Sequence, residues 1–147
     1  MTRGNDPLEG PPEGRISHTC ITYGRSLFIY GGEKTYNTNE MKRACFNDLW
    51  VFETVKNEWR EQVYFGVTRP KARRCHAAVR AERNMVVYGG IDANGKFQKE
   101  IWLFNLTTFK WSLALQPKET KYYKNKGIAF HKMVCLPDNI IPAPVQE

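Results

Sequence analysis

Three histidines are the side chains of this sequence best suited to chemistry: His18, His76 and His131. Cys20 follows the first of them and Cys75 precedes the second, and imidazole and thiolate groups are preferred ligands of zinc. The structural alternative is that one position of a repeated unit makes the same hydrogen bond in every copy. Because repetition favours this alternative, we assign the histidines a structural role and expect neither a metal site nor a cofactor.

Motifs of common enzymes are absent from the sequence. It contains no G-x-S-x-G, no H-E-x-x-H, no phosphate-binding loop and no dinucleotide fingerprint, which are patterns that hold reactive groups at fixed spacings. Cys45 is a candidate for an exposed thiol, but only Lys42 and Arg43 are near enough in the sequence to activate it. We therefore expect a protein that is not an enzyme.

Basic residues gather in the segments 33–46, 68–74 and 118–126, which are the best candidates for binding a partner. Arginine donates forked hydrogen bonds to carboxylate and phosphate groups, and tyrosine provides stiff contact area, so an acidic or phosphorylated partner would suit them. The alternative is that these charges are only solvated. The candidate contact residues are Lys34, Lys42, Arg43, Arg69, Lys71, Arg74, Lys121, Tyr122, Tyr123 and Lys124.

Amino-acid composition indicates which kinds of binding partner and which cellular compartment to expect. The 147 residues have a formal net charge of +7 and are 41% hydrophobic, which is typical of one globular domain that favours acidic partners. Nucleic acid is the alternative partner, although no helix-turn-helix, zinc or RNA-recognition motif accompanies the charge. No apolar run is long enough to span a bilayer and no secretory signal is present. We therefore expect a cytoplasmic protein with a protein partner and no membrane.

One pattern occurs twice along the chain. RISHTCITYGRSLFIYGG at 15–32 matches RRCHAAVRAERNMVVYGG at 73–90, and NDLWVFETVKNEW at 47–59 matches KEIWLFNLTTFKW at 99–111. The spacing differs only in the loop between the Gly-Gly pair and the first tryptophan, as expected of a repeat whose length changes fall in loops. The motif residues with an expected structural role are Arg15, His18, Gly31, Gly32, Trp50, Trp59, Arg73, His76, Gly89, Gly90, Trp102, Trp111 and His131.

Each copy divides into four short runs of aliphatic and aromatic residues bounded by turn residues, which predicts four antiparallel strands joined by tight turns. The predicted strands are 16–23, 26–31, 48–53, 58–63, 74–80, 84–89, 100–105 and 110–115, and 128–136 is the predicted first strand of a third copy. The Gly-Gly pairs should take positive φ. Trp59 and Trp111 should pack between neighbouring sheets. The expected fold class is all-β.

Arg-x-x-His, a hydrophobic strand closed by Gly-Gly and a spaced tryptophan together resemble the Kelch repeat, a blade of a β-propeller. The resemblance covers about residues 12–136. It implies that the first strand of each blade lines a central channel. It also implies that the loops between second and third strands, and between successive blades, gather on one face that usually binds a partner. Members of this family are mostly protein-interaction scaffolds or adaptors, with a few enzymes, so a fragment of a propeller enzyme is a further alternative.

Two blades are too few to close a propeller, which needs about four to eight. We expect the missing blades to come from the rest of a longer chain, or otherwise from self-association. The predicted organisation is a tail at 1–14, a first blade at 15–63, a linker at 64–73, a second blade at 74–115, a basic linker at 116–127, one strand at 128–136 and a tail at 137–147.

Overall fold

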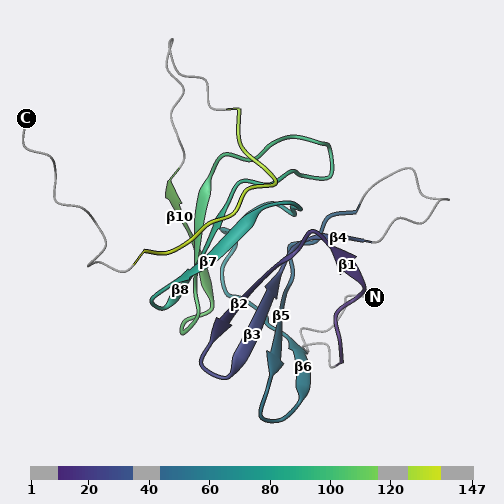
Figure 1. Cartoon of the computed structure of the whole chain (residues 1–147), viewed down its shortest axis with the longest axis vertical. Coiled ribbons are helices and arrows are strands. Elements are labelled where there is room, and N and C mark those ends of the chain that lie inside the picture. The colour runs from purple at the N-terminus through teal and green to yellow at the C-terminus, as the bar shows by residue number, and fades with distance from the viewer. Residues whose placement is uncertain (1–9, 35–43, 116–125, 137–147) are drawn as a thin grey trace, which may run out of the picture.

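The computed structural model describes residues 10–34, 44–115 and 126–136, in which two four-stranded antiparallel sheets lie side by side (Figure 1). The first sheet has the order β2 (Thr19–Tyr23), β3 (Ser26–Tyr30), β5 (Leu49–Glu53) and β6 (Glu58–Glu61). The second has the order β7 (Ala77–Ala81), β8 (Asn84–Tyr88), β9 (Ile101–Asn105) and β10 (Lys110–Leu115). β1 (Arg15–Ile16) pairs with β4 (Glu33–Lys34). None of these residues forms a helix that could cross a membrane.

Both copies form the predicted four-stranded sheet, but the first predicted strand of each copy is interrupted. Ser17 has a φ of 58°, which separates β1 from β2, and Cys75 has a φ of 54°, which delays β7 to Ala77. A left-handed φ is uncommon for a residue with a Cβ atom. Phe130 repeats it with a φ of 60°. The kink therefore belongs to the repeat, and propensity alone does not reveal it.

The kinks connect one copy to the next through the backbone. The amide of Cys75 donates to the carbonyl of Ser17 at 3.1 Å, and the amide of Phe130 donates to the carbonyl of Cys75 at 2.9 Å. Because a left-handed residue turns its peptide groups out of the strand direction, these groups become available to a neighbouring copy. The inner strands β2 and β7 consequently lie beside each other.

The core lies between the two sheets. Alternate residues of each strand point to one face, and each sheet contributes one apolar face to the interface. Trp111 is the largest side chain there, and its ring lies 5.0 Å from Tyr30 and 5.0 Å from Phe104. The first sheet contributes Ile21, Phe28, Tyr30, Leu49 and Val51, and the second contributes Met85, Val87, Phe104, Leu106 and Trp111.

No strand forms over 128–136 among the described residues, although the sequence predicts one there. The first residues of this segment are nevertheless held against the second sheet, because the amide of Gly90 donates to the carbonyl of Ile128 at 2.7 Å. A strand needs a hydrogen-bonded neighbour along its length. None of the backbone hydrogen bonds among the described residues involves 132–136. The segment follows the course of a first strand without a second strand beside it.

The Gly-Gly pairs take positive φ as predicted. Gly31 has a φ of 62°, and a Cβ atom there would lie 2.8 Å from the carbonyl oxygen of Arg73 and 2.9 Å from the ring of His76. Gly89 has a φ of 68°, and a Cβ atom there would meet Ile128 and His131. Each glycine therefore permits the next copy to approach the end of the strand closely.

Candidate protein-interaction face

The loops between the second and third strands of each sheet, and the segments that lead from one sheet to the next, gather at one end of the molecule. Figure 1 shows β4, the connection after β8 and the chain near residue 127 at this end, with the β2–β3 and β5–β6 turns at the other. Backbone hydrogen bonds join these segments, from Arg73 to Phe46 and from Arg74 to Ile91. We call the described residues 33–34, 44–47, 69–74, 91–98 and 126–128 the loop face.

Buried ionic and polar contacts hold the loop face in place. Arg74 Nε lies 3.3 Å from a carboxylate oxygen of Glu33, and both side chains are largely buried. Asp92 accepts hydrogen bonds from the amides of Asn94 at 3.0 Å and Lys96 at 2.9 Å, and its other oxygen accepts one from Gln98 at 3.2 Å. Because an ion pair or hydrogen bonds within the protein occupy both carboxylates, these side chains hold the loops in place and do not contact a partner.

Two arginines of the repeated motif fasten the strands beneath this face. Arg15 donates to both oxygens of Asp48, at 2.6 and 2.9 Å, and to the carbonyl of Gly31 at 3.1 Å. Arg73 donates to the carbonyl of Gly89 at 2.8 Å, and its side chain is only 1% exposed. Burial lowers the pKa of Arg73. Both guanidinium groups therefore join a Gly-Gly strand end to the start of their own copy.

The exposed cations of the loop face are Lys34, which pairs with Glu13, and Arg69, Lys71, Lys96 and Lys126. Arg69 lies over the ring of Tyr64, with 5.6 Å between its guanidinium carbon and the ring centre, which fixes the side chain without neutralising it. The ion pairs formed within the described part of the chain include none of the last four of these cations. Lys96 was not among the predicted contacts, although the Asp-Ala-Asn-Gly-Lys turn at 92–96 would have identified an exposed loop tip.

The structure separates the predicted contact residues into three groups. Arg69 and Lys71 are exposed, and Lys34 is exposed but pairs with Glu13 at 2.8 Å. Arg74 is withdrawn from the predicted set, because its guanidinium is largely buried against the carboxylate of Glu33 in β4. The remaining candidates lie outside the described residues: Lys42, Arg43, Lys121, Tyr122, Tyr123 and Lys124.

Cys45 is not the exposed thiol that its loop position suggested. It is half-buried, with its sulfur 3.9 Å from the carbonyl oxygen of Ile91, and burial raises the pKa of its thiol. A raised pKa leaves less of the nucleophilic thiolate at neutral pH. The four cysteines are Cys20, Cys45, Cys75 and Cys135, and all are free thiols.

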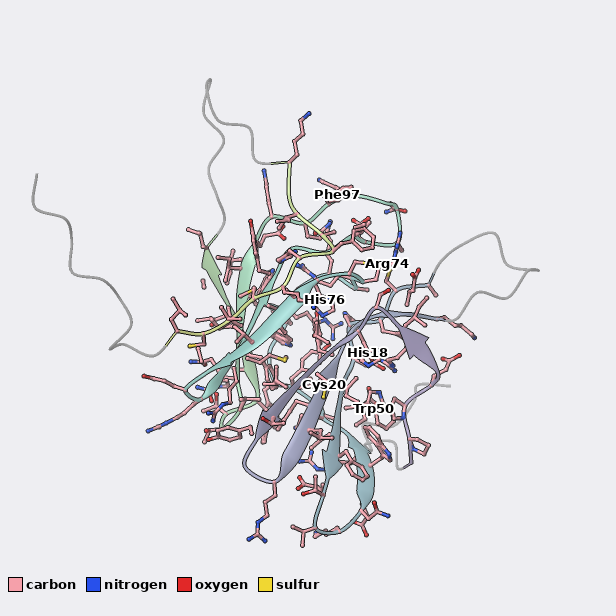
Figure 2. The ribbon with its side chains drawn as sticks, viewed as in Figure 1. His18, Cys20, Trp50, Arg74, His76 and Phe97 are labelled. Atoms are coloured by element: carbon pink, nitrogen blue, oxygen red, sulfur yellow. The ribbon has the colours of Figure 1, made fainter. Side chains whose placement is uncertain are left out.

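His18 and His76 occupy equivalent positions of the repeat and lie near the centre of the molecule (Figure 2). His76 forms a 2.8 Å hydrogen bond with the hydroxyl of Thr19, and its ring lies 5.3 Å from Tyr30. Burial, with Arg73 nearby, lowers the pKa of His76 to about 3. His131 repeats the ring contact, 5.1 Å from Tyr88. Within the described residues no group of histidine, cysteine, aspartate or glutamate side chains is arranged to hold a metal ion.

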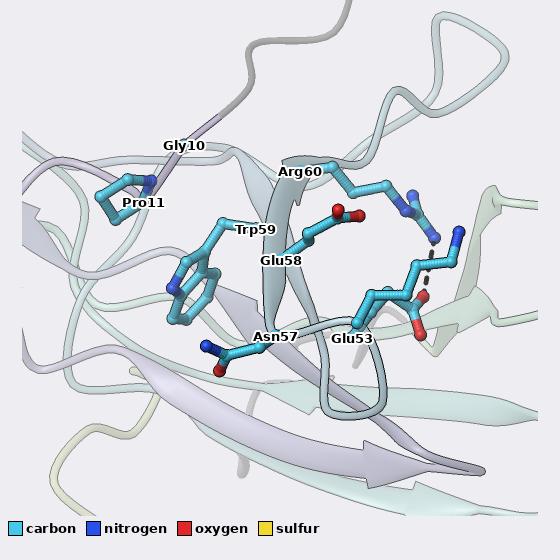
Figure 3. Close-up of a pocket in the computed structure, with 8 residues that line it drawn as sticks. Gly10, Pro11, Glu53, Asn57, Glu58, Trp59 and Arg60 are labelled. Atoms are coloured by element: carbon cyan, nitrogen blue, oxygen red, sulfur yellow. Dashed lines mark hydrogen bonds and ion pairs between the residues drawn. The ribbon is translucent and has the colours of Figure 1, made fainter.

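A separate hollow of about 870 Å³ lies on the outer side of the first sheet (Figure 3). Trp59 forms part of its wall, with Gly10 and Pro11 across from it and the Glu53–Arg60 ion pair, 3.4 Å long, beside it. Trp59 was predicted to pack between two sheets. Among the described residues a sheet lies on only one side of Trp59, so this prediction stays untested for Trp59, whereas Trp111 lies between the two sheets.

Comparison with known proteins identifies the repeat. Residues 4–142 match the KLHDC2/KLHL20/DRC7 Kelch-repeats domain. The chain is 34% identical to the F-box/kelch-repeat protein At1g51550 of Arabidopsis thaliana over 104 residues, which are 67% of this chain and 20% of that protein. It is 28% identical to Kelch domain-containing protein 10 of Xenopus laevis over 127 residues, which are 82% of this chain and 29% of that protein. The chain thus spans less than a third of either relative.

The fold has a counterpart among solved structures. The structure of YjhT superposes with a TM-score of 0.60 at 18% sequence identity, covering 78% of this chain and 40% of that chain. At this identity the likeness concerns the fold alone. Taken with the repeated Gly-Gly strand ends, the buried arginines and the tryptophan between the sheets, it shows a partial propeller with two four-stranded blades. The chain belongs to the Kelch-repeat family.

Proposed function

We propose that this chain is part of a non-catalytic protein-interaction module whose loop face binds an acidic or phosphorylated segment. Kelch repeats are generally protein-interaction modules, and the finer assignment rests on one observation. The carboxylates of Glu33 and Asp92 on the loop face, and of Asp48 beneath it, are engaged in internal contacts, whereas Arg69, Lys71 and Lys96 stay exposed. The face therefore presents donors and positive charge.

The form of these donors supports an anionic segment rather than a single small ion. Arg69 is held over the ring of Tyr64, which itself packs against the core, so a planar, forked donor is fixed in place at the surface. Arginine and tyrosine are the side chains most often responsible for affinity in protein interfaces. Lysines on neighbouring loops would then add attraction over a longer stretch of the partner.

Matched charge reversals test this proposal. The loop-face variant carries Arg69→Glu, Lys71→Glu and Lys96→Glu, and the control carries Arg25→Glu, Arg83→Glu and Lys110→Glu, which are exposed in the opposite turns and on β10. The probes are a fluorescent glutamate-rich peptide and the same peptide containing phosphoserine, measured by anisotropy. We expect the loop-face variant to lose about tenfold in affinity and the control to stay within about twofold.

Three results would contradict the proposal. Equal losses in both variants would show that only the net charge matters, and unchanged binding in the loop-face variant would place the contact elsewhere. The third is competition by a single-stranded RNA of the same charge with a steep dependence on salt, which would favour the nucleic-acid alternative. Circular dichroism of both variants must match that of the parent chain.

We also propose that the remaining blades belong to a longer polypeptide that acts in the cytoplasm. The small share of each relative that this chain spans supports the first point, and the free thiols support the second. Light scattering after size exclusion tests the alternative of self-association. A monomer supports the longer polypeptide, and a well-folded dimer or trimer would contradict it.

A further inference from the structure

A groove lies where the last strand of the first blade meets the second blade. Its volume is about 770 Å³, and it is lined by residues 60–66 at the end of β6 and by Phe109 in the turn between β9 and β10. Both blades that enclose it are complete four-stranded sheets, so its shape does not depend on a further blade. We call it the rim groove, because β6 and β10 are the last strands of their sheets.

Backbone hydrogen bonds hold the linker segment 62–66 against both blades. The amide of Gln62 donates to a carbonyl of β5 at 2.7 Å, and the amide of Phe65 donates to the carbonyl of Phe109 at 3.0 Å. Phe65 also forms a parallel bridge with Lys110 at the start of β10. The segment is therefore extended here, and its alternate side chains point to opposite sides.

This alternation gives the linker a buried side and an exposed apolar side. Tyr64 turns its ring to the core, where the ring centre lies 6.4 Å from those of Phe104 and Trp111. Val63 and Phe65 point the other way and are 45% and 59% exposed. Single exposed apolar residues are common, but two that share one side of a fixed segment beside a hollow indicate a binding surface.

Phe109 lines the groove in a backbone conformation that does not suit its residue type. Its φ is 54°, a left-handed value that is an outlier for a bulky side chain. The equivalent residue of the first blade is Asn57, with a φ of 59°, and asparagine adopts this conformation more readily. The ring of Phe109 packs 6.4 Å from that of Phe104 and also lines the groove. The second blade thus places an aromatic ring where local preference favours asparagine, and such strain is concentrated at functional sites.

Polar side chains of the lining are engaged within the protein. Arg60 pairs with Glu53 at 3.4 Å, and the side-chain amide of Gln62 donates to the carbonyl of Val63 at 2.7 Å. Because these groups already have partners, a bound segment gains little by offering them charge. The groove therefore favours apolar side chains over polar ones.

Tyr64 joins the rim groove to the loop face. It lines the groove, and the guanidinium carbon of Arg69 lies 5.6 Å from the centre of its ring. Phe65 and Arg69 are four residues apart, which is at most about 13 Å along an extended chain. A single short segment can therefore place an acidic group on Arg69 and apolar groups beside Phe65.

We propose that the acidic segment bound by the loop face also carries two bulky aliphatic side chains, which it places in the rim groove. This inference rests on the proposed function and adds a requirement on the partner's sequence. The acidic residues meet Arg69, and alternate aliphatic residues about four positions away cover Phe65 and Phe109. Charge complementarity at Arg69 sets the register of the segment, and apolar burial in the groove adds affinity.

Labelled peptides test whether charge and apolar side chains are recognised together. The leucine peptide is EEEESSLSL, and its reversed sequence, LSLSSEEEE, covers the opposite chain direction. The serine peptide, EEEESSSSS, has the same charge and replaces both leucines. Fluorescence anisotropy measures the affinity of each peptide.

The groove variant carries Val63→Ser with Phe65→Ser, which keeps both backbone amides. The control carries Val55→Ser with Val134→Ser, whose valines are 67% and 78% exposed and do not line the groove. A second groove variant, Phe109→Asn, introduces the residue of the first blade at the equivalent position. Circular dichroism of all three variants must match that of the parent chain.

We expect the parent chain and the control to bind the leucine peptide, in one of its two directions, about tenfold more tightly than the serine peptide. Both groove variants should lose most of this preference and bind the serine peptide as the parent chain does. Equal affinity of the parent chain for the leucine and serine peptides would overturn the proposal. A preference for leucine that the groove variants retain would overturn it as well.

The charge-reversed loop-face variant separates this proposal from the proposed function. It should bind both peptides more weakly while keeping the ratio of their affinities. A ratio near one in the parent chain, with both peptides weakened by charge reversal, would overturn the groove proposal alone. Unchanged binding of both peptides by the loop-face variant would overturn the proposed function. A dimer of the parent chain that the groove variant dissociates and the leucine peptide does not displace would assign the groove to a second copy and overturn the proposal.

Discussion

Trp59 and Trp111 occupy the same position in the two blades but have different surroundings. Each packs against the phenylalanine of the adjacent strand, with 4.9 Å between the rings of Phe52 and Trp59 and 5.0 Å between those of Phe104 and Trp111. Trp111 also meets Tyr30 of the other blade and is 6% exposed, whereas Trp59 is half-buried beside a hollow. The strand pairing thus orients the ring, and the neighbouring blade buries it.

The same distinction holds across each blade. One face of the second blade is buried against the first, and the equivalent face of the first blade is only partly covered. Since neighbour contacts provide much of the stability of a repeat, residues at equivalent positions should contribute unequally to the stability of the two blades. The corresponding pairs are Leu27 and Met85, Ile29 and Val87, Phe52 and Phe104, and Trp59 and Trp111.

Truncating the two tryptophans tests this inequality most strongly. Trp111→Ala should lower the free energy of unfolding by about 3–5 kcal/mol, because it leaves a cavity between the blades. Trp59→Ala should cost about 1–2 kcal/mol, because its ring is already partly in water. Urea denaturation followed by circular dichroism measures both. Equal losses would mean that burial by the neighbouring blade is not what distinguishes the two positions.

Acidification should weaken the interface through the buried histidine. The pKa of His76 is about 3 in the folded chain against 6.5 for a free imidazole. The unfolded chain therefore binds the proton more strongly between these values, and stability falls as the pH drops from 6.5 towards 3. The loss should approach about 1.4 kcal/mol per pH unit. His76→Gln should flatten this dependence, and His18→Gln, at the exposed equivalent position, should change it less.

Adding a methyl group at Gly31 and at Gly89 compares two strand ends. The first lies against a complete blade, and the second lies against the segment 128–131 alone. Gly31→Ala should cost about 2–3 kcal/mol, because the Cβ atom meets Arg73 and His76, which are held in the second blade. Gly89→Ala should cost about 1–2 kcal/mol, because the Ile128 carbonyl that its Cβ atom meets is held by a few backbone hydrogen bonds and not by a complete sheet. Gly24→Ala, with a φ of 60° and no atom within 4 Å of its Cβ, isolates the backbone strain. A larger loss at Gly89 than at Gly31 would reverse the comparison.

Neutralising one carboxylate in each blade should give the smallest difference. Asp48→Asn should cost about 2 kcal/mol, because Asp48 accepts two hydrogen bonds from Arg15 and one from Trp50. Glu100→Gln should cost less than about 1 kcal/mol, because its oxygen lies 3.7 Å from the guanidinium of Arg73. Thermal unfolding of the two variants at pH 7 provides the comparison.

The repeated pattern predicted most of the fold because it records side-chain periodicity. Alternating apolar residues and Gly-Gly pairs located all eight strands of the two blades within two or three residues. The breaks at Ser17 and Cys75 were not predictable in this way, because neither residue type signals a left-handed φ. The segment 128–136 carries a strand pattern, but pairing also depends on a partner strand.

The candidate face was less predictable than the fold. Charge and loop position correctly placed Arg69 and Lys71 among exposed cations. Arg74 has the same residue type and lies in the same linker, yet Glu33 from a distant part of the chain buries its charge. Such a pair depends on which segments the blades bring together, and a single sequence does not contain that information.

The kink shared by Ser17, Cys75 and Phe130 makes the molecule a one-dimensional array of repeats, in which each repeat contacts only its neighbours. Each kinked residue is hydrogen-bonded to the one before it, so every blade is coupled to its immediate neighbour by the same set of bonds. In such an array the free energy of local unfolding is lowest in the outermost strands. Amide exchange should therefore be slowest in β3 and β8, on either side of the shared interface, and quicken outward in both directions.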